Sequence, residues 1–218
     1  MDYKLARMNM VENQIRANRV TDDKVIEAFK EVPREHFVPI TLKDISYNDE
    51  DILLAKNRYM MKPMVLARFF QFLSLKGNEN ILHIGSNTGY ASAILSRLCS
   101  AVISIESDKK LYEKSISNLS ELSFDNVVPL HGQMENGVSK EAPFDVIFIE
   151  GSIEQTPNIL FNQLNENGKL IVTLRPYGMS IGKANLFFKI NNEIGREELF
   201  DSQVYQLPIF KNKIKFSF

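Results

Sequence analysis

The stretch that most constrains the fold of this chain runs from Ile81 to Tyr90 and reads Ile-Leu-His-Ile-Gly-Ser-Asn-Thr-Gly-Tyr. An apolar run ends abruptly at Gly85, a second glycine follows at Gly89, and residues 91–98 have a helical composition. This order predicts a buried strand, a tight glycine turn and a helix. Because glycine has no Cβ and a helix N-terminus carries unpaired N–H groups, such a turn can hold a ligand against bare backbone.

An acidic residue follows at the spacing expected of a nucleoside-binding site. The next apolar run, residues 101–105, ends at Glu106, which lies 21 residues after Gly85. In α/β folds a carboxylate about 20 residues beyond the first glycine binds ribose hydroxyls. A dinucleotide fingerprint would need glycines where this chain has Asn87 and Tyr90, so a nicotinamide cofactor is disfavoured. The alternative is a purely structural turn, and the position of the carboxylate favours the cofactor.

Length, charge and cysteine content exclude several classes of protein. The 218 residues suit one α/β domain, and 26 basic against 27 acidic residues leave a net charge of −1. Binding to nucleic acid or an anionic membrane through bulk charge is therefore disfavoured. A single cysteine, Cys99, excludes an internal disulfide, and no long apolar run or signal pattern is present, so we expect a cytoplasmic protein. Cys99 and the three histidines show no metal-ligand spacing, and we expect no metal.

The N-terminal part is predicted to be mainly helical. Apolar periodicity indicates a helix over residues 8–15, Thr21 is the expected cap of a second helix, and Pro63 begins a third helix that Gly77 ends. Residues 40–61 lack a clear period, which predicts a long irregular loop. Loops of that length are often functional.

From residue 77 onward, apolar runs alternate with helical ones. Predicted strands cover residues 81–84, 101–105, 126–130, 144–149 and 169–174, and predicted helices cover residues 91–98, 108–122 and 157–166. The alternation predicts an α/β fold with a doubly wound, mostly parallel sheet covered on both faces. Residues 184–190, an Asn191-Asn192 turn and a last strand near Ile214 to Phe218 predict an antiparallel C-terminal edge.

Several longer motifs carry a resemblance to a known enzyme family. They are Met10-Val-Glu-Asn-Gln-Ile-Arg16, Val32-Pro-Arg-Glu-His-Phe-Val-Pro39, Pro63-Met-Val-Leu-Ala-Arg68, the glycine turn, Ile103-Ser-Ile-Glu106, Ala142-Pro-Phe-Asp145 and residues 160–170. Through these motifs the sequence resembles the protein-L-isoaspartate O-methyltransferase family, which repairs isomerised aspartyl residues with S-adenosylmethionine. The agreement extends in order over residues 10–175.

The resemblance implies a class I S-adenosylmethionine-dependent methyltransferase fold in a single domain over residues 1–218. Residues 1–76 would form an N-terminal helical extension with the substrate loop, residues 77–176 the cofactor-binding core, and residues 177–218 the C-terminal antiparallel strands. The implied cofactor is S-adenosyl-L-methionine, and the implied substrate is a protein or peptide with isoaspartyl residues. Oligomeric state is not predicted.

The resemblance also assigns a cofactor site. Its expected residues are His83, Gly85, Ser86, Asn87, Gly89, Tyr90, Glu106, Gly132 and Gln133. The glycine turn would hold the methionine part of the cofactor, Glu106 the ribose hydroxyls and Gln133 the adenine edge. A carboxylate accepts hydrogen bonds from two vicinal hydroxyls, and an amide both donates and accepts. The family usually has an acidic residue at the position of His83, glycine at Asn87 and aspartate at Gln133.

A larger departure lies in the predicted substrate loop. The family's Gly-His-Gly-Gln-Thr-Ile-Ser-x-Pro segment falls on Ala55-Lys-Asn-Arg-Tyr-Met-Met-Lys-Pro63, so Met61 stands where the family has a serine. That serine is thought to contact the isoaspartyl carboxylate, and a thioether has no donor to replace it. The alternative for Met61 and its methionine neighbours is ordinary packing.

Methyl transfer to a carboxylate needs no general base, because the carboxyl group is already ionised at neutral pH. It needs alignment and exclusion of water. At this loop Arg58 and Lys62 are the candidate side chains for binding the substrate carboxylate, and the alternative is that both are surface cations. Three functions remain open: an isoaspartyl methyltransferase, a methyltransferase with a changed substrate, and a non-catalytic cofactor-binding relative.

Overall fold

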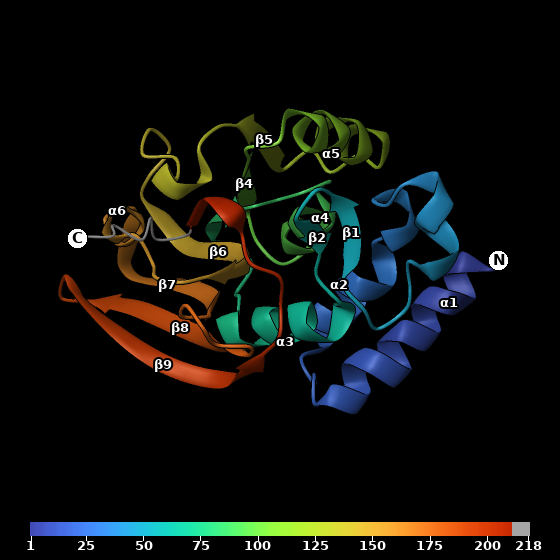
Figure 1. Ribbon diagram of the computed structural model, residues 1–218, viewed down its shortest axis with the longest axis horizontal. Helices are drawn as coiled ribbons and strands as arrows, with labels where there is room; N and C mark the ends of the chain where they lie inside the picture. Colours follow the sequence, from blue (N-terminus) through green and yellow to red (C-terminus); the bar gives the residue numbers. More distant parts are fainter. Residues whose placement is uncertain (211–218) are drawn as a thin grey trace.

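The computed structural model describes residues 1–210, in which a central sheet is flanked by helices (Figure 1). The sheet has the strand order β5-β4-β3-β6-β7-β8-β9. Its strands are β3 (Asn80–Ile84), β4 (Ala101–Glu106), β5 (Val127–His131), β6 (Phe144–Ile153), β7 (Leu164–Leu174), β8 (Gly182–Ile190) and β9 (Glu193–Ser202). From β5 to β7 all neighbours pair in parallel, whereas β8 and β9 pair antiparallel. The predicted doubly wound sheet with an antiparallel edge is confirmed.

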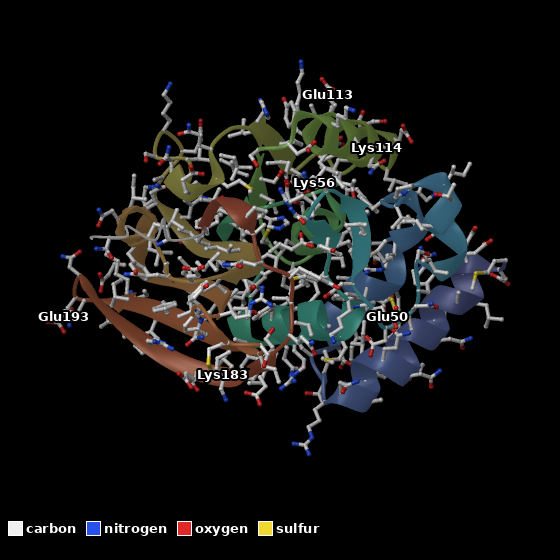
Figure 2. The ribbon with its side chains drawn as sticks, viewed as in Figure 1. Glu50, Lys56, Glu113, Lys114, Lys183 and Glu193 are labelled. Carbon is white, nitrogen blue, oxygen red and sulfur yellow. The ribbon has the colours of Figure 1, made fainter. Side chains whose placement is uncertain are left out.

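Helices cover both faces of this sheet. They are α1 (Tyr3–Met10), α2 (Asp23–Glu31), α3 (Pro63–Leu73), α4 (Tyr90–Ser96), α5 (Lys109–Glu121) and the short α6 (Asn158–Phe161). Successive strand residues face opposite sides: Ile81 belongs to the cluster that contains α1 to α4, and Leu82 belongs to the cluster that contains Leu160 of α6. Glu113 and Lys114 project outward from α5 (Figure 2), which leaves its apolar stripe for the sheet.

Several helix boundaries differ from those predicted. The helix expected over residues 8–15 begins earlier, as α1, and continues beyond Met10 as a π-helical segment, Val11–Ile15. Asp22, not Thr21, caps α2, because its carboxylate accepts hydrogen bonds from the Lys24 and Val25 N–H groups at 2.9 and 3.4 Å. Helix α3 ends at Leu73 rather than at Gly77, since Ser74 already has the left-handed φ of 52°.

The prediction of an irregular loop over residues 40–61 is wrong in part. The segment contains a 3₁₀ turn, Ile40–Ile45, and an antiparallel hairpin of β1 (Ile52–Ala55) and β2 (Arg58–Met60). The strands have four and three residues, which is too short for alternation to be visible in the sequence. Asn57 makes the turn between them with a φ of 59°.

The predicted helix over residues 157–166 is also shorter than expected. Helix α6 ends at Phe161, and Leu164 already pairs with Phe144 of β6. Gln163 lies between the two elements and donates to the Asn136 carbonyl at 2.8 Å, which draws the chain out of helical geometry. The antiparallel edge consists of β8 and β9, joined at Asn191-Asn192. The predicted last strand near Ile214 lies outside the described residues.

None of the helices within residues 1–210 is long and apolar enough to cross a membrane. Among the same residues, no three histidine, cysteine, aspartate or glutamate side chains gather where they could hold a metal ion.

Candidate functional site

The glycine turn, residues 85–89, lies between β3 and α4, as predicted. Its Gly85, Asn87 and Gly89 have φ values of 82°, 52° and 98°, a left-handed conformation that glycine adopts freely and asparagine tolerates. The Gly85 N–H donates to the Ile105 carbonyl of β4 at 2.9 Å. A Cβ on Gly85 would lie 3.2 Å from the Glu150 carbonyl oxygen. This tight turn therefore presents bare backbone at the carboxyl ends of the central strands.

Glu106 ends β4 directly beside this turn and is fully buried. Its carboxylate accepts backbone N–H hydrogen bonds from Asn87 at 2.9 Å, from Ser107 at 2.8 Å and from Asp108 at 2.9 Å. The Gly132 N–H donates to the Glu106 carbonyl at 3.1 Å, which brings the turn after β5 to the same place. The structure thus gathers the ends of β3, β4 and β5, the location at which parallel α/β sheets bind ligands.

Other residues expected at the cofactor site are distributed more widely. Gln133 is exposed, and its side-chain oxygen accepts from the Asn136 amide at 2.7 Å. The Ser86 hydroxyl is buried and makes no hydrogen bond within the described residues. Tyr90 packs in the core against Phe37, at 5.6 Å between ring centroids, and burial raises the pKa of its phenol to about 12.

His83 also lies in the core, in the middle of β3. Its Nδ1 is 2.7 Å from the Ser92 hydroxyl, and its Nε2 is 3.2 Å from Oε2 of Glu150 at the end of the apolar run of β6. The other carboxylate oxygen, Oε1, accepts from the Met61 N–H at 3.3 Å. Glu150 was missed by the sequence reasoning, although its place directly after a predicted strand was an available signal.

The Arg58 guanidinium binds the carboxylate of Glu106, the group that was expected to bind ribose. Its Nη1 donates to Oε1 of Glu106, and its Nη2 donates to Oε2 at 2.7 Å. The same Nη2 donates to the Asn87 side-chain oxygen at 3.1 Å. Arg58 is 5% exposed, so the alternative that it is a surface cation is wrong. Nor is its guanidinium open to a substrate carboxylate, because Glu106 already holds it.

A C-terminal strap, residues 203–207, covers the glycine turn. The Leu207 N–H donates to the Ser152 carbonyl and the Ser152 N–H donates to the Tyr205 carbonyl, both at 2.9 Å. The buried Leu207 side chain lies 3.4 Å from where a Cβ on Gly85 would be. The ring of Tyr205 stacks on that of Tyr59 in β2, with 3.5 Å between centroids. The hairpin and the strap therefore close over the turn together.

The donor set fits S-adenosylmethionine, but the space in this closed arrangement does not. Glu106 has the two acceptor oxygens that vicinal hydroxyls need, and the glycine turn exposes backbone. Yet residues 85–89 and Glu106 are all buried, and the neighbouring cavity between the hairpin, the strap and Gly151 has a volume of about 10 Å³, which is room for about one water molecule. A nucleoside enters only if Arg58 and Leu207 move.

Met61 and Lys62 lie in different surroundings. The Met61 side chain is buried in the core, as its packing alternative predicted, and its carbonyl accepts from Nη2 of Arg34 at 2.9 Å. Lys62 lines a surface hollow of about 500 Å³ that we call the acceptor hollow. Its lining residues are Asp49, Glu50, Asp51, Lys62, Arg175, Gln203, Val204 and Tyr205.

Comparison with known proteins identifies the family of this chain. The family model described as protein-L-isoaspartate(D-aspartate) O-methyltransferase matches residues 6–206. A relative named protein-L-isoaspartate O-methyltransferase 2 from Anaeromyxobacter sp. is 36% identical over 79% of this chain and 71% of its own length. Another of the same name from Shewanella sediminis is 35% identical over 79% of this chain and 70% of its own length.

Solved structures show the same fold. A protein-L-isoaspartate O-methyltransferase superposes with a TM-score of 0.81 at 26% identity, over 92% of this chain, which spans 65% of that longer chain. A Plasmodium falciparum protein described as a beta-aspartate methyltransferase, in complex with S-adenosyl-L-homocysteine, superposes with a TM-score of 0.79 at 24% identity, over 92% of this chain and 97% of its own. The resemblance seen in the sequence is confirmed, and the chain belongs to the protein-L-isoaspartate(D-aspartate) O-methyltransferase family, an S-adenosylmethionine-dependent enzyme class.

Proposed function

We propose that this chain is an S-adenosylmethionine-dependent protein carboxyl O-methyltransferase that acts on isoaspartyl residues. The observation that supports this function best is Glu106, a carboxylate held by three backbone N–H groups beside the glycine turn. In a chain of this family, that arrangement has the chemistry to bind ribose hydroxyls. Gly132, whose N–H bonds to the Glu106 backbone, would place the adenine next to β5.

The chain's own residues would act by positioning rather than by proton transfer. When bound, S-adenosylmethionine supplies a methyl group on a positively charged sulfur. A substrate carboxylate is ionised at neutral pH and needs no base, so the protein must orient it and exclude water. In the closed arrangement residues 85–89 of the glycine turn are all buried, and they contact both the hairpin and the strap. Arg58 and Leu207 lie on these two segments, so both segments would have to move to admit the cofactor.

We assign substrate binding to the acceptor hollow, which lies next to the stacked tyrosine of the strap. It contains two cations, Lys62 and Arg175, either of which can donate to a carboxylate. The backbone of Lys62 is held in place, because its backbone N–H donates to the Asp51 carboxylate at 2.7 Å. Burial raises the pKa of that carboxyl group. The acidic residues Asp49, Glu50 and Asp51 also line this hollow, and they would favour peptides with basic residues near the isomerised site.

A second candidate function is a methyltransferase with a changed acceptor. It is favoured by Met61, which stands at the family's serine position and turns its side chain into the core. The substrate carboxylate would then lack one hydroxyl donor, a loss of about 1 to 3 kcal/mol if that acceptor is buried unpaired.

The test is transfer of a labelled methyl group from S-adenosylmethionine to an isoaspartyl peptide, with the matched aspartyl peptide as control. The proposed function predicts base-labile label in the isoaspartyl peptide only. Lys62→Glu should raise the KM for the peptide, and Lys114→Glu, on the outer face of α5 (Figure 2), should leave it unchanged. Label on other proteins but not on the peptide would favour the changed acceptor.

A further inference from the structure

The carboxylate of Glu106 has no acceptor position left for a ribose. Its Oε1 accepts from Ser107, Asp108 and Arg58, and its Oε2 accepts from Asn87 and Arg58. A carboxylate has about four lone-pair sites, so these five donors saturate it. Three of them are backbone groups of neighbouring turns. Arg58, from the hairpin, is the donor that can leave without unfolding a strand end.

Asn87 holds Arg58 in this position. Its side-chain oxygen accepts from the guanidinium at 3.1 Å, and its amide nitrogen donates to the Tyr59 carbonyl at 3.1 Å. It also donates to the Gly85 carbonyl at 3.1 Å. This one side chain thus joins the hairpin to the glycine turn. Because Asn87 has a φ of 52°, glycine would fit the same backbone and remove all three contacts.

The strap closes the remaining part of the site. Leu207 is 3% exposed, and its Cγ lies 2.7 Å from where a Cβ on Gly151 would be, so it fills the hollow between two glycines. Arg58 and Leu207 lie on segments that meet through the Tyr59–Tyr205 stack. Arg58 therefore occupies the polar end of the site, at Glu106, and Leu207 occupies the apolar end, between Gly85 and Gly151. The Tyr59–Tyr205 stack links the two segments that carry them.

We infer that Arg58 is an internal competitor for the cofactor, a latch on Glu106 that keeps the site closed until the hairpin and the strap open together. The inference rests on the proposed function, since it concerns the same cofactor site. A protein whose competent state is a minor one binds its ligand more weakly by that fraction. Weakening the latch must therefore tighten cofactor binding, although the substitution removes contacts of the folded protein.

The experiment is calorimetric titration of the full chain with S-adenosylhomocysteine alone. Arg58→Met keeps the aliphatic stem and removes the guanidinium, and we expect it to lower the Kd about tenfold or more, because Glu106 is then free for the ribose. Asn87→Gly leaves the ion pair intact and loosens its anchor, so a smaller decrease is expected. Arg97→Met is the matched control: Arg97 pairs with Glu31 on the surface at 3.2 Å, and its loss should not change the Kd. Circular dichroism establishes that each variant is folded.

Hydrogen exchange supplies a readout that does not depend on affinity. In the wild-type chain, S-adenosylhomocysteine should speed exchange of the Leu207 amide, which is bonded to Ser152 in the closed state. Equal and tight binding by the wild type, Arg58→Met and Asn87→Gly would overturn the latch and leave the proposed function standing. No binding by any folded variant at millimolar ligand would overturn both. Binding that leaves the Leu207 amide unchanged would also overturn the latch, because the site would not have opened.

Discussion

His83 and Glu150 form a buried contact between adjacent strands of the sheet: Nε2 of the imidazole lies 3.2 Å from Oε2 of the carboxylate, and neither side chain is more than 2% exposed. The imidazole ring also stacks on Phe148, with 5.0 Å between centroids. An acidic residue at position 83 would lie as close to Glu150 as His83 does, and two acids so close together would repel each other. Because position 83 is a histidine, a buried acid is tolerated at position 150. The Glu150 carboxylate also accepts a hydrogen bond from the Met61 N–H.

We expect Glu150→Gln to lower the free energy of unfolding by about 2 kcal/mol, because it replaces the buried carboxylate that faces the imidazole and accepts from the Met61 N–H. Glu31→Gln breaks the exposed pair with Arg97 and should cost less than about 1 kcal/mol. Urea denaturation measures both. In a double-mutant cycle with His83→Gln, the two positions should show a coupling of about 0.5 kcal/mol or more. Independent effects at positions 83 and 150 would contradict the pairing.

Stability should fall in strongly alkaline solution because of Tyr90. Burial raises the pKa of its phenol from 10.0 to about 12, so the folded state binds the proton more tightly than the unfolded state. This contribution is complete below pH 10 and is lost as the pH rises toward 12, a change of about 2 to 3 kcal/mol. Tyr90→Phe should flatten this part of the stability curve, whereas Tyr177→Phe, at a side chain 79% exposed, should not. Parallel curves for the wild type and Tyr90→Phe would refute the assignment.

Much of the sheet was predictable because its strands carry long apolar runs. Residues such as Ile81 and Ile149 lie in strands buried on both faces, and a doubly covered strand needs apolar side chains at every position. The glycine turn and Glu106 were predictable for a related reason: the chemistry of a nucleoside site fixes their spacing along one chain segment.

The closure of the site was not predictable from local pattern. Arg58 and Glu106 are 48 residues apart, and no period or spacing in the sequence connects them. Leu207 lies still farther along the chain, in a segment with no regular element of its own beyond a single bridge from Gln206 to Ser152. Such contacts depend on how the hairpin and the strap pack on the finished sheet. For that reason neither alternative for Arg58, a substrate-binding side chain or a surface cation, included its pairing with Glu106.

Gly85 is predicted to be intolerant of any side chain. Gly85→Ala should cost about 2 to 3 kcal/mol, since it combines a left-handed backbone with a Cβ placed 3.2 Å from the Glu150 carbonyl oxygen. Gly178→Ala separates the two causes, because Gly178 has a φ of 85° and no atom within 4 Å of the added Cβ. It should cost about 1 kcal/mol. Thermal or urea denaturation of both variants gives the difference, and equal costs would show that the close approach at the turn does not matter.

The last prediction concerns Met61→Ser, which introduces the serine that the sequence resemblance implies at this position. The packing loss is large at this position, because Met61 is 2% exposed and belongs to the main core cluster. Truncating a buried methionine costs about 2 to 5 kcal/mol, so the variant should be destabilised by about 3 kcal/mol. Met179→Ser, at a side chain 60% exposed, is the matched control and should change stability by less than about 0.5 kcal/mol.

The activity of Met61→Ser then depends on where the hydroxyl lies. The Met61 backbone is fixed from two sides, by Arg34 at its carbonyl and by Glu150 at its N–H, so the substitution should leave the loop in place and put the hydroxyl in the core. We therefore expect no gain in methylation of an isoaspartyl peptide per folded molecule, measured by label transfer at a temperature well below the midpoint of thermal unfolding. A gain of about tenfold or more, the worth of one recovered hydrogen bond, would show instead that the loop can turn this position toward the substrate. In that case the methionine, rather than the closed site, would limit the native activity.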